Sequence, residues 1–149
     1  MPTNPFSTCI DFSDKRQNAT FRDKKGKTSY VFPNQARNNI SGLRVDGCIL
    51  VDDKKCDFLL LNHENDKAWA TLIELKGSDL LQAVRQIDAT IDKLSGKLKD
   101  YKLHGRIVLT KTYAPHLQSS EYLKLRKKLK NIGGSFETGN VQYVEKTIV

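Results

Sequence analysis

The strongest hydrophobic pattern along the chain is a pair of apolar runs that flank a short polar segment. The first run is Cys56–Asn62 and the second is Ala68–Lys76, and each reads as a strand that is buried on both faces. Asn65 and Asp66 lie in the polar segment between the runs and suit a tight two-residue turn. The pattern therefore predicts an antiparallel hairpin.

The register of this hairpin would place two carboxylates side by side, because the tight turn puts Asp57 directly opposite Glu74. Directly opposed residues share one face of a sheet, with Cβ atoms about 5 Å apart. Side chains alternate along a strand, so Glu74 and Lys76 share a face and Leu75 points the other way. Two carboxylates at this distance repel one another unless a cation joins them. A divalent metal with oxygen ligands is such a cation.

Apolar patterns on both sides of the hairpin predict further elements. Leu43–Val51 predicts a strand before the hairpin, which would make an antiparallel meander of three strands. Ser78 can cap a helix that follows the hairpin. The apolar stripe of this helix recurs at alternating four- and three-residue steps: Leu80, Val84, Ile87, Ile91, Leu94 and Leu98. Gly105–Thr110 predicts a fourth strand, which would join the meander through a crossover.

The two ends of the chain carry weaker patterns. Residues 1–38 are polar and predict no core segment, only a short helix or hairpin around Thr28–Phe32. Ser119 and Ser120 can cap a second helix that runs to about Asn131. After it, residues 135–138 and 141–147 predict a closing hairpin.

The predicted order of elements, β-β-β-α-β-α-β, is typical of a mixed α/β fold. We expect one domain over residues 1–149, with a core at about 43–110 and the second helix and closing hairpin at 119–149. In this arrangement helices would cover both faces of the sheet.

Composition places the chain among soluble proteins, with a mean hydropathy of −0.52. No apolar run approaches the ~20 residues that a membrane span needs, so we expect no membrane partner. The N-terminal segment has no basic region followed by a hydrophobic stretch, so we expect no signal peptide. The cysteines Cys9, Cys48 and Cys56 are odd in number and lack CxxC spacing, which favours free thiols in a reducing cytoplasm over a disulfide or zinc site.

The net charge of +8 favours a polyanionic partner, with nucleic acid ahead of an acidic membrane surface. The most basic helical stretch is Lys124–Lys130, KLRKKLK. Within it Arg126, Lys127 and Lys128 are candidates for contacts to nucleic-acid phosphates. The other interpretation of this stretch is an ordinary solvated helix face.

The acid at the start of one strand and Glu74-Leu75-Lys76 at the end of the next resemble the PD-(D/E)xK, or restriction-endonuclease-like, nuclease superfamily. In that family an acidic residue begins the second core strand, a D/E-x-K motif lies on the third, and a helix and another strand follow. The resemblance covers about Leu43–Thr110 and implies a restriction-endonuclease-like mixed β-sheet flanked by helices. Upstream of it are only Asp11, Asp14 and Asp23, where many members have an acidic residue on a helix.

The resemblance implies metal-dependent hydrolysis of phosphodiester bonds, with DNA favoured over RNA. Asp57, Glu74 and the carbonyl of Leu75 would hold Mg²⁺, with Mn²⁺ as a substitute. Lys76 would orient the attacking water or stabilise charge on the phosphate. Gln86 would match a glutamine that some members carry on the following helix. Asp46 is a further candidate ligand, for which a turn or edge contact is the favoured interpretation.

Other interpretations stay open beside the nuclease. A non-catalytic nucleic-acid-binding or immunity-type protein could retain the fold, although a pure binder has no need for two opposed carboxylates. A subunit that is active only in a larger complex is also consistent with the short chain, as is a homodimer.

Overall fold

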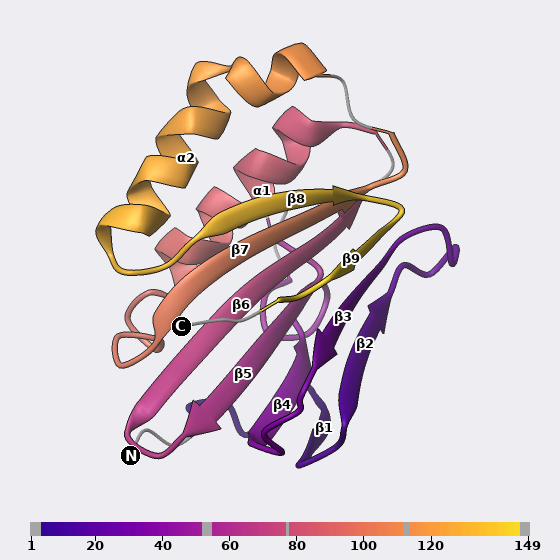
Figure 1. Ribbon diagram of the computed structural model, residues 1–149. Helices are drawn as coiled ribbons and strands as arrows, with labels where there is room; N and C mark the ends of the chain where they lie inside the picture. The colour runs from indigo at the N-terminus through magenta and orange to yellow at the C-terminus, as the bar shows by residue number, and fades with distance from the viewer. Residues whose placement is uncertain (1–3, 52–54, 77, 112–113, 147–149) are drawn as a thin grey trace.

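The computed structural model describes residues 4–51, 55–76, 78–111 and 114–146, and Figure 1 shows their arrangement. They form a mixed α/β structure in which two β-sheets pack against one another (Figure 1). Both α-helices lie on the far side of the larger sheet from the smaller one. This larger sheet therefore has helices on one face and a sheet on the other.

The larger sheet has six strands in the order β1-β4-β5-β6-β7-β8. Their bounds are β1 (Ile10–Asp14), β4 (Asn39–Arg44), β5 (Phe58–Glu64), β6 (Lys67–Lys76), β7 (Lys102–Leu109) and β8 (Phe136–Asn140). Strands β1, β4, β5 and β6 pair antiparallel, whereas β7 runs parallel to β6, and β8 runs parallel to β7. The predicted meander followed by a crossover strand is confirmed.

The central hairpin forms in the predicted register. Glu64 pairs with Lys67 and Leu61 pairs with Ala70 across β5 and β6. Asn65 occupies the turn with φ of 53°, a left-handed conformation that asparagine tolerates better than most residues. A local turn and the alternation of side chains together fix this register.

Helix α1 (Leu80–Leu94) makes the crossover between β6 and β7. Its predicted apolar stripe is buried against the large sheet and against α2 (Ser120–Asn131). The cap of α1 is Asp79 and not Ser78, because the Asp79 carboxylate accepts a hydrogen bond from the Gln82 N–H at 2.9 Å. Ser119 caps α2 as predicted, and a short 3-10 helix, η1 (Ala114–Gln118), precedes it.

The smaller sheet covers the other face of the large sheet, so the expectation of helices on both faces was wrong. It consists of β2 (Asn18–Arg22), β3 (Ser29–Pro33) and β9 (Gln142–Val144). A second apolar core fills the space between the two sheets: Ala19, Phe21, Tyr30, Phe32, Ile40, Leu60, Ile73, Leu75 and Val108. Residues 1–38 therefore do contribute core segments, and the described part of them forms strands with no helix. Each short strand buries few apolar side chains, which is why the pattern was weak.

The end of the chain does not form the predicted closing hairpin. Strand β8 pairs with β7 in the large sheet, whereas β9 pairs with β3 in the small one, and both pairings are parallel. Val141, which separates the two strands, has φ of 63° and redirects the chain between the sheets. Two adjacent short strands looked like a hairpin because the sequence does not reveal distant partners.

The strand predicted over Leu43–Val51 was misplaced, because the chain turns immediately after β4. Gly47 has φ of +75°, and its N–H donates to the carbonyl of Leu50 at 2.9 Å. This turn brings Cys48 to Cys9, and the two form a disulfide with Cα atoms 5.7 Å apart. The expectation of three free thiols was therefore wrong. Only Cys56 among the three is a free cysteine, and it is buried.

Buried polar groups join the two sheets near the end of the chain. The Arg106 guanidinium of β7 contacts Glu145 with an Nε–Oε2 distance of 2.8 Å and an Nη2–Oε1 distance of 3.1 Å. The Tyr30 hydroxyl of β3 donates to the same Oε2 at 2.7 Å. Arg106 Nη2 also donates to the Ser135 hydroxyl, which lies 2.8 Å from His104 Nδ1. All of these residues except Ser135 are nearly inaccessible to solvent.

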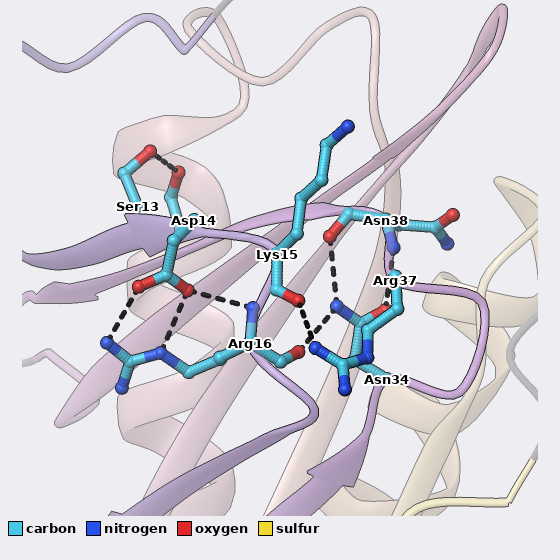
Figure 2. Close-up of polar contacts among 8 residues, drawn as sticks. Ser13, Asp14, Lys15, Arg16, Asn34, Arg37 and Asn38 are labelled. Atoms are coloured by element: carbon cyan, nitrogen blue, oxygen red, sulfur yellow. Dashed lines mark hydrogen bonds and ion pairs between the residues drawn. The ribbon is translucent and has the colours of Figure 1, made fainter.

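At one end of the small sheet, Asn34 holds two chain connections together (Figure 2). Its side-chain amide donates to the carbonyls of Arg16 and Asn38, both at 2.9 Å. Arg16 is in turn paired with Asp14, with an Nε–Oδ1 distance of 2.9 Å. The opposite end of β2 and β3 is the one that faces the candidate site.

No helix in the described ranges is long and apolar enough to cross a membrane.

Candidate functional site

The structure brings Asp57 and Glu74 into one pocket of about 430 Å³. Asp57 directly precedes β5, and its N–H donates to the carbonyl of Ile73 at 3.1 Å. The β5–β6 register ends at the Phe58–Ile73 pair, so Asp57 directly precedes this pair on one strand and Glu74 directly follows it on the other. The pocket lies where β6 ends, and the tight turn at the other end of the hairpin sets this alignment.

The two carboxylates differ in their surroundings. Glu74 has a relative exposure of only 1%, whereas Asp57 is half-buried. One oxygen of Asp57, Oδ2, accepts a hydrogen bond from the Leu75 N–H at 2.9 Å. This bond fixes the orientation of the Asp57 carboxylate toward β6. Leu75 itself lines the pocket.

A buried thiol beside the site is excluded as a nucleophile. Burial raises the pKa of the Cys56 thiol well above its ordinary value, and the negative charge of Glu74 raises the pKa further. The thiol is therefore protonated at neutral pH, and the thiolate is the reactive form.

Lys76, the third residue of the motif, is the last residue of β6 and pairs with Leu109 of β7. The position of its side chain lies outside the described part of the structure. Gln86 lies on α1 and does not line the pocket. Its side-chain oxygen is buried and has no hydrogen-bond partner among the described residues.

Helix α1 nevertheless contacts the chain that leads into the site. The Thr90 hydroxyl accepts a hydrogen bond from the Cys56 N–H at 2.8 Å and donates one to the Gln86 carbonyl at 2.7 Å. Cys56 directly precedes Asp57 in the chain. Gln86 therefore lies one helical turn before Thr90, the residue that binds the Cys56 N–H. This contact positions the start of β5 against the helix.

Asp46, for which the sequence analysis favoured a turn or edge contact over a metal ligand, lines the same pocket as Asp57 and Glu74. The turn after β4 brings its N–H to 3.3 Å from the Asp57 carbonyl. Its carboxylate is 3.5 Å from the ammonium group of Lys55. The Asp46-Gly47 pair was the available signal, because this dipeptide favours a turn and not a continuing strand.

The pocket also has a basic side that the sequence analysis missed. Five cations line it: Arg22, Lys24, Lys25, Lys27 and Arg44. Four of them come from residues 22–27, which connect β2 to β3. The run RDKKGK between two short apolar segments was the available signal.

The basic residues predicted on α2 lie elsewhere. The ammonium group of Lys128 is 2.7 Å from Asp88 Oδ1 and 2.9 Å from Asp92 Oδ1 on α1, so it is engaged in helix packing. Arg126 and Lys127 line a second pocket, of about 520 Å³, together with Lys130. The two pockets share no lining residue.

Asp57 and Glu74 have the chemistry of a magnesium site, because Mg²⁺ prefers carboxylate and other oxygen ligands. In proteins this ion keeps several waters and often takes only one or two carboxylates. Within the described residues, no three or more His, Cys, Asp or Glu side chains gather closely enough to hold a metal ion. Water and substrate oxygens, together with the predicted Leu75 carbonyl, would therefore have to complete the coordination.

Comparison of the chain with protein-family models, with curated proteins and with solved structures gives no match.

Proposed function

We propose that this chain is a metal-dependent nuclease that hydrolyses phosphodiester bonds, with DNA as the favoured substrate over RNA. The observation that carries the proposal is the meeting of Asp57 and Glu74, from adjacent strands, in a pocket with a basic wall. The resemblance to the PD-(D/E)xK superfamily, including its restriction-endonuclease-like fold, supports it. Phosphodiester chemistry needs both features, since cations bind the phosphate and carboxylates bind the metal.

The roles of the residues follow from their surroundings. Asp57 and Glu74 would hold Mg²⁺, or Mn²⁺ in its place, and the ion would lower the pKa of a bound water and polarise the phosphate. The Leu75 N–H keeps the Asp57 carboxylate in a fixed orientation at 2.9 Å. Burial of Glu74 places its charge in a medium of low polarity, where it attracts a cation more strongly than in water. Lys76 is proposed to stabilise charge on the phosphate.

Cleavage should depend on the metal and on Glu74. We expect the protein to cut DNA in the presence of Mg²⁺ or Mn²⁺ and to be inactive in EDTA. Glu74→Gln should lower the cleavage rate by about 100-fold or more, which corresponds to about 2.7 kcal/mol of lost transition-state stabilisation. Plasmid and single-stranded substrates measured on gels would test this. Glu64→Gln, at the far end of the same hairpin, is the matched control and should cleave as the parent does.

Metal binding should be visible without any substrate. We expect Mg²⁺ to raise the free energy of unfolding by about 2.7 kcal/mol at a hundredfold excess over its dissociation constant. Glu74→Gln should lose most of this gain, and Glu64→Gln should keep it. Thermal melting with and without Mg²⁺ measures the effect. An equal metal-induced shift in the Glu74→Gln variant would place the ion elsewhere. A protein that binds DNA but gives no metal-induced shift would favour the non-catalytic alternative.

A further inference from the structure

Residues 22–27, which we call the basic turn, comprise the last residue of β2 and most of the connection to β3, and they have a defined shape. Its N–H and carbonyl groups close the turn, because the Asp23 N–H donates to the Thr28 carbonyl at 3.0 Å and the Gly26 N–H donates to the Asp23 carbonyl at 2.8 Å. Gly26 has φ of +70°, a conformation that favours glycine. The cationic side chains therefore project from a closed turn and not from an irregular loop.

The cations of the basic turn have no acidic partners among the described residues. Arg22, Lys24, Lys25 and Lys27 are exposed, and no ion pair or side-chain hydrogen bond engages them. Some other cations of the protein are paired with acidic side chains. Arg16 is held by Asp14 at the opposite end of the small sheet (Figure 2), and Arg85 is held by Glu121 at 2.8 Å. Residues 22–27 contain four positive charges and the single negative charge of Asp23, and this local excess of three positive charges would attract a polyanion.

The basic turn lies beside the carboxylates of the candidate site. Its cations line the same pocket as Asp57 and Glu74. Figure 1 places the β2–β3 connection at the end of the molecule where β6 and β7 end. Arg44 adds a further cation to this wall, although it also pairs with Asp11 at 3.0 Å.

We propose that the basic turn grips the phosphates of a nucleic acid next to the phosphate that a metal ion on Asp57 and Glu74 would bind. This inference rests on the proposed function and names the element that binds its substrate. A strand of nucleic acid offers successive negative charges along its backbone, which matches a row of cations next to a metal-binding pair of carboxylates. The prediction for Arg126 and Lys127 of α2 concerns a different pocket and is tested in the same experiment.

An acidic membrane surface fits the basic turn less well. Residues 23–27, DKKGK, contain no apolar side chain that could enter the acyl boundary of a bilayer. The cations also line a pocket, whereas a flat lipid surface would be contacted by cations on a protruding surface. Nucleic acid is therefore the partner that these residues favour.

The test compares two triple variants that remove equal charge. One is K24Q/K25Q/K27Q in the basic turn, and the other is R126Q/K127Q/K130Q on α2. Each lowers the formal net charge by three, from +8 to +5. Binding of a fluorescent DNA duplex is measured by anisotropy in EDTA, so that no cleavage occurs, from 50 to 200 mM salt.

We expect the basic-turn variant to bind more weakly and with less salt dependence. The salt slope is the slope of the logarithm of the association constant against the logarithm of the salt concentration. Each lost phosphate contact lowers its magnitude by about 0.9, so three lost contacts lower it by about 2.7. The parent should consequently lose about 40-fold more affinity than this variant between 50 and 200 mM salt. The α2 variant should keep a slope within about one unit of the parent.

Three results would overturn the inference. The first is a basic-turn variant whose DNA binding has the same salt slope as that of the parent. The second is an equal loss of DNA affinity in both variants, which would mean that only the net positive charge of the protein matters. The third is a parent protein that binds phosphatidylserine vesicles more tightly than DNA at the same salt concentration, together with a basic-turn variant that has lost this vesicle binding. Because the substituted lysines are exposed, the melting temperature should stay at the parent value and exclude a folding defect.

Failure of the inference can be distinguished from failure of the proposed function. If the parent cleaves in a Glu74-dependent manner while the basic-turn variant binds as the parent does, the inference fails and the nuclease stands. If the basic turn carries DNA binding but no metal supports cleavage, the nuclease fails and the binding element stands.

Discussion

Replacement of Glu145 by alanine is expected to lower the free energy of unfolding by about 3–5 kcal/mol. The substitution leaves the Arg106 guanidinium, which has a relative exposure of 3%, without its carboxylate partner in the interior. It also removes the acceptor of the Tyr30 hydroxyl. A loss of this size is a large fraction of the 5–15 kcal/mol that typically separates folded from unfolded domains. Urea denaturation followed by circular dichroism measures it.

Two further variants separate the buried charge from simple packing. Glu137→Ala, an exposed site on β8, should change the free energy of unfolding by no more than about 0.5 kcal/mol. The double variant R106M/E145L removes both charges and should be less destabilised than Glu145→Ala, because no unpaired ion stays buried. A double variant as unstable as the single one would show that the shape of this region matters more than its charge.

Stability is expected to fall by roughly 3 kcal/mol as the pH drops from about 6.5 to about 4, mainly because of His104. Burial, together with the positive charges of Arg106 and Lys102, lowers the pKa of His104 to about 4. In the unfolded chain this imidazole would titrate near its ordinary value of about 6.5. Between these two values the unfolded state binds a proton that the folded state does not bind, so the stabilisation is complete above about 6.5 and is lost as the pH falls. Burial also lowers the pKa of His63, which acts in the same direction.

Urea denaturation at pH 4.5 and at pH 7 tests the role of His104. His104→Gln should show a smaller difference in free energy between the two pH values than the parent does. The measured quantity is the difference in free energy of unfolding between the two pH values. The test therefore stays valid even if loss of the contact between His104 and Ser135 lowers stability at both pH values. An unchanged difference in the variant would assign the pH dependence to other groups.

The elements that the sequence predicted well are those that local patterns specify. The β5–β6 hairpin follows from a tight turn at Asn65 and from alternating faces, and Asp57 and Glu74 meet in one pocket at its open end. Helix α1 follows from its apolar stripe. Half of the candidate site was therefore visible before the structure was known.

The elements that the sequence did not reveal depend on distant partners. Strand β2 buries only Ala19 and Phe21 between exposed residues, and such a strand becomes recognisable only beside its partner. The disulfide of Cys9 with Cys48 depends on a turn that the sequence analysis had taken for a strand. The basic wall of the pocket was missed for the same reason, because the small sheet places it beside Asp57.

The parallel pairing of β3 with β9 has a consequence for the order in which the protein is assembled during synthesis. Ser29 pairs with Gln142, and 113 positions along the chain separate the two partners. Contacts between such distant segments form late, and an isolated two-stranded hairpin such as β2–β3 is marginally stable in water. The growing chain would thus contain the β5–β6 segment with both carboxylates well before β9 is available to pair with β3 and secure the basic turn. The small sheet that carries the basic turn would be among the last parts of the newly made protein to become stable.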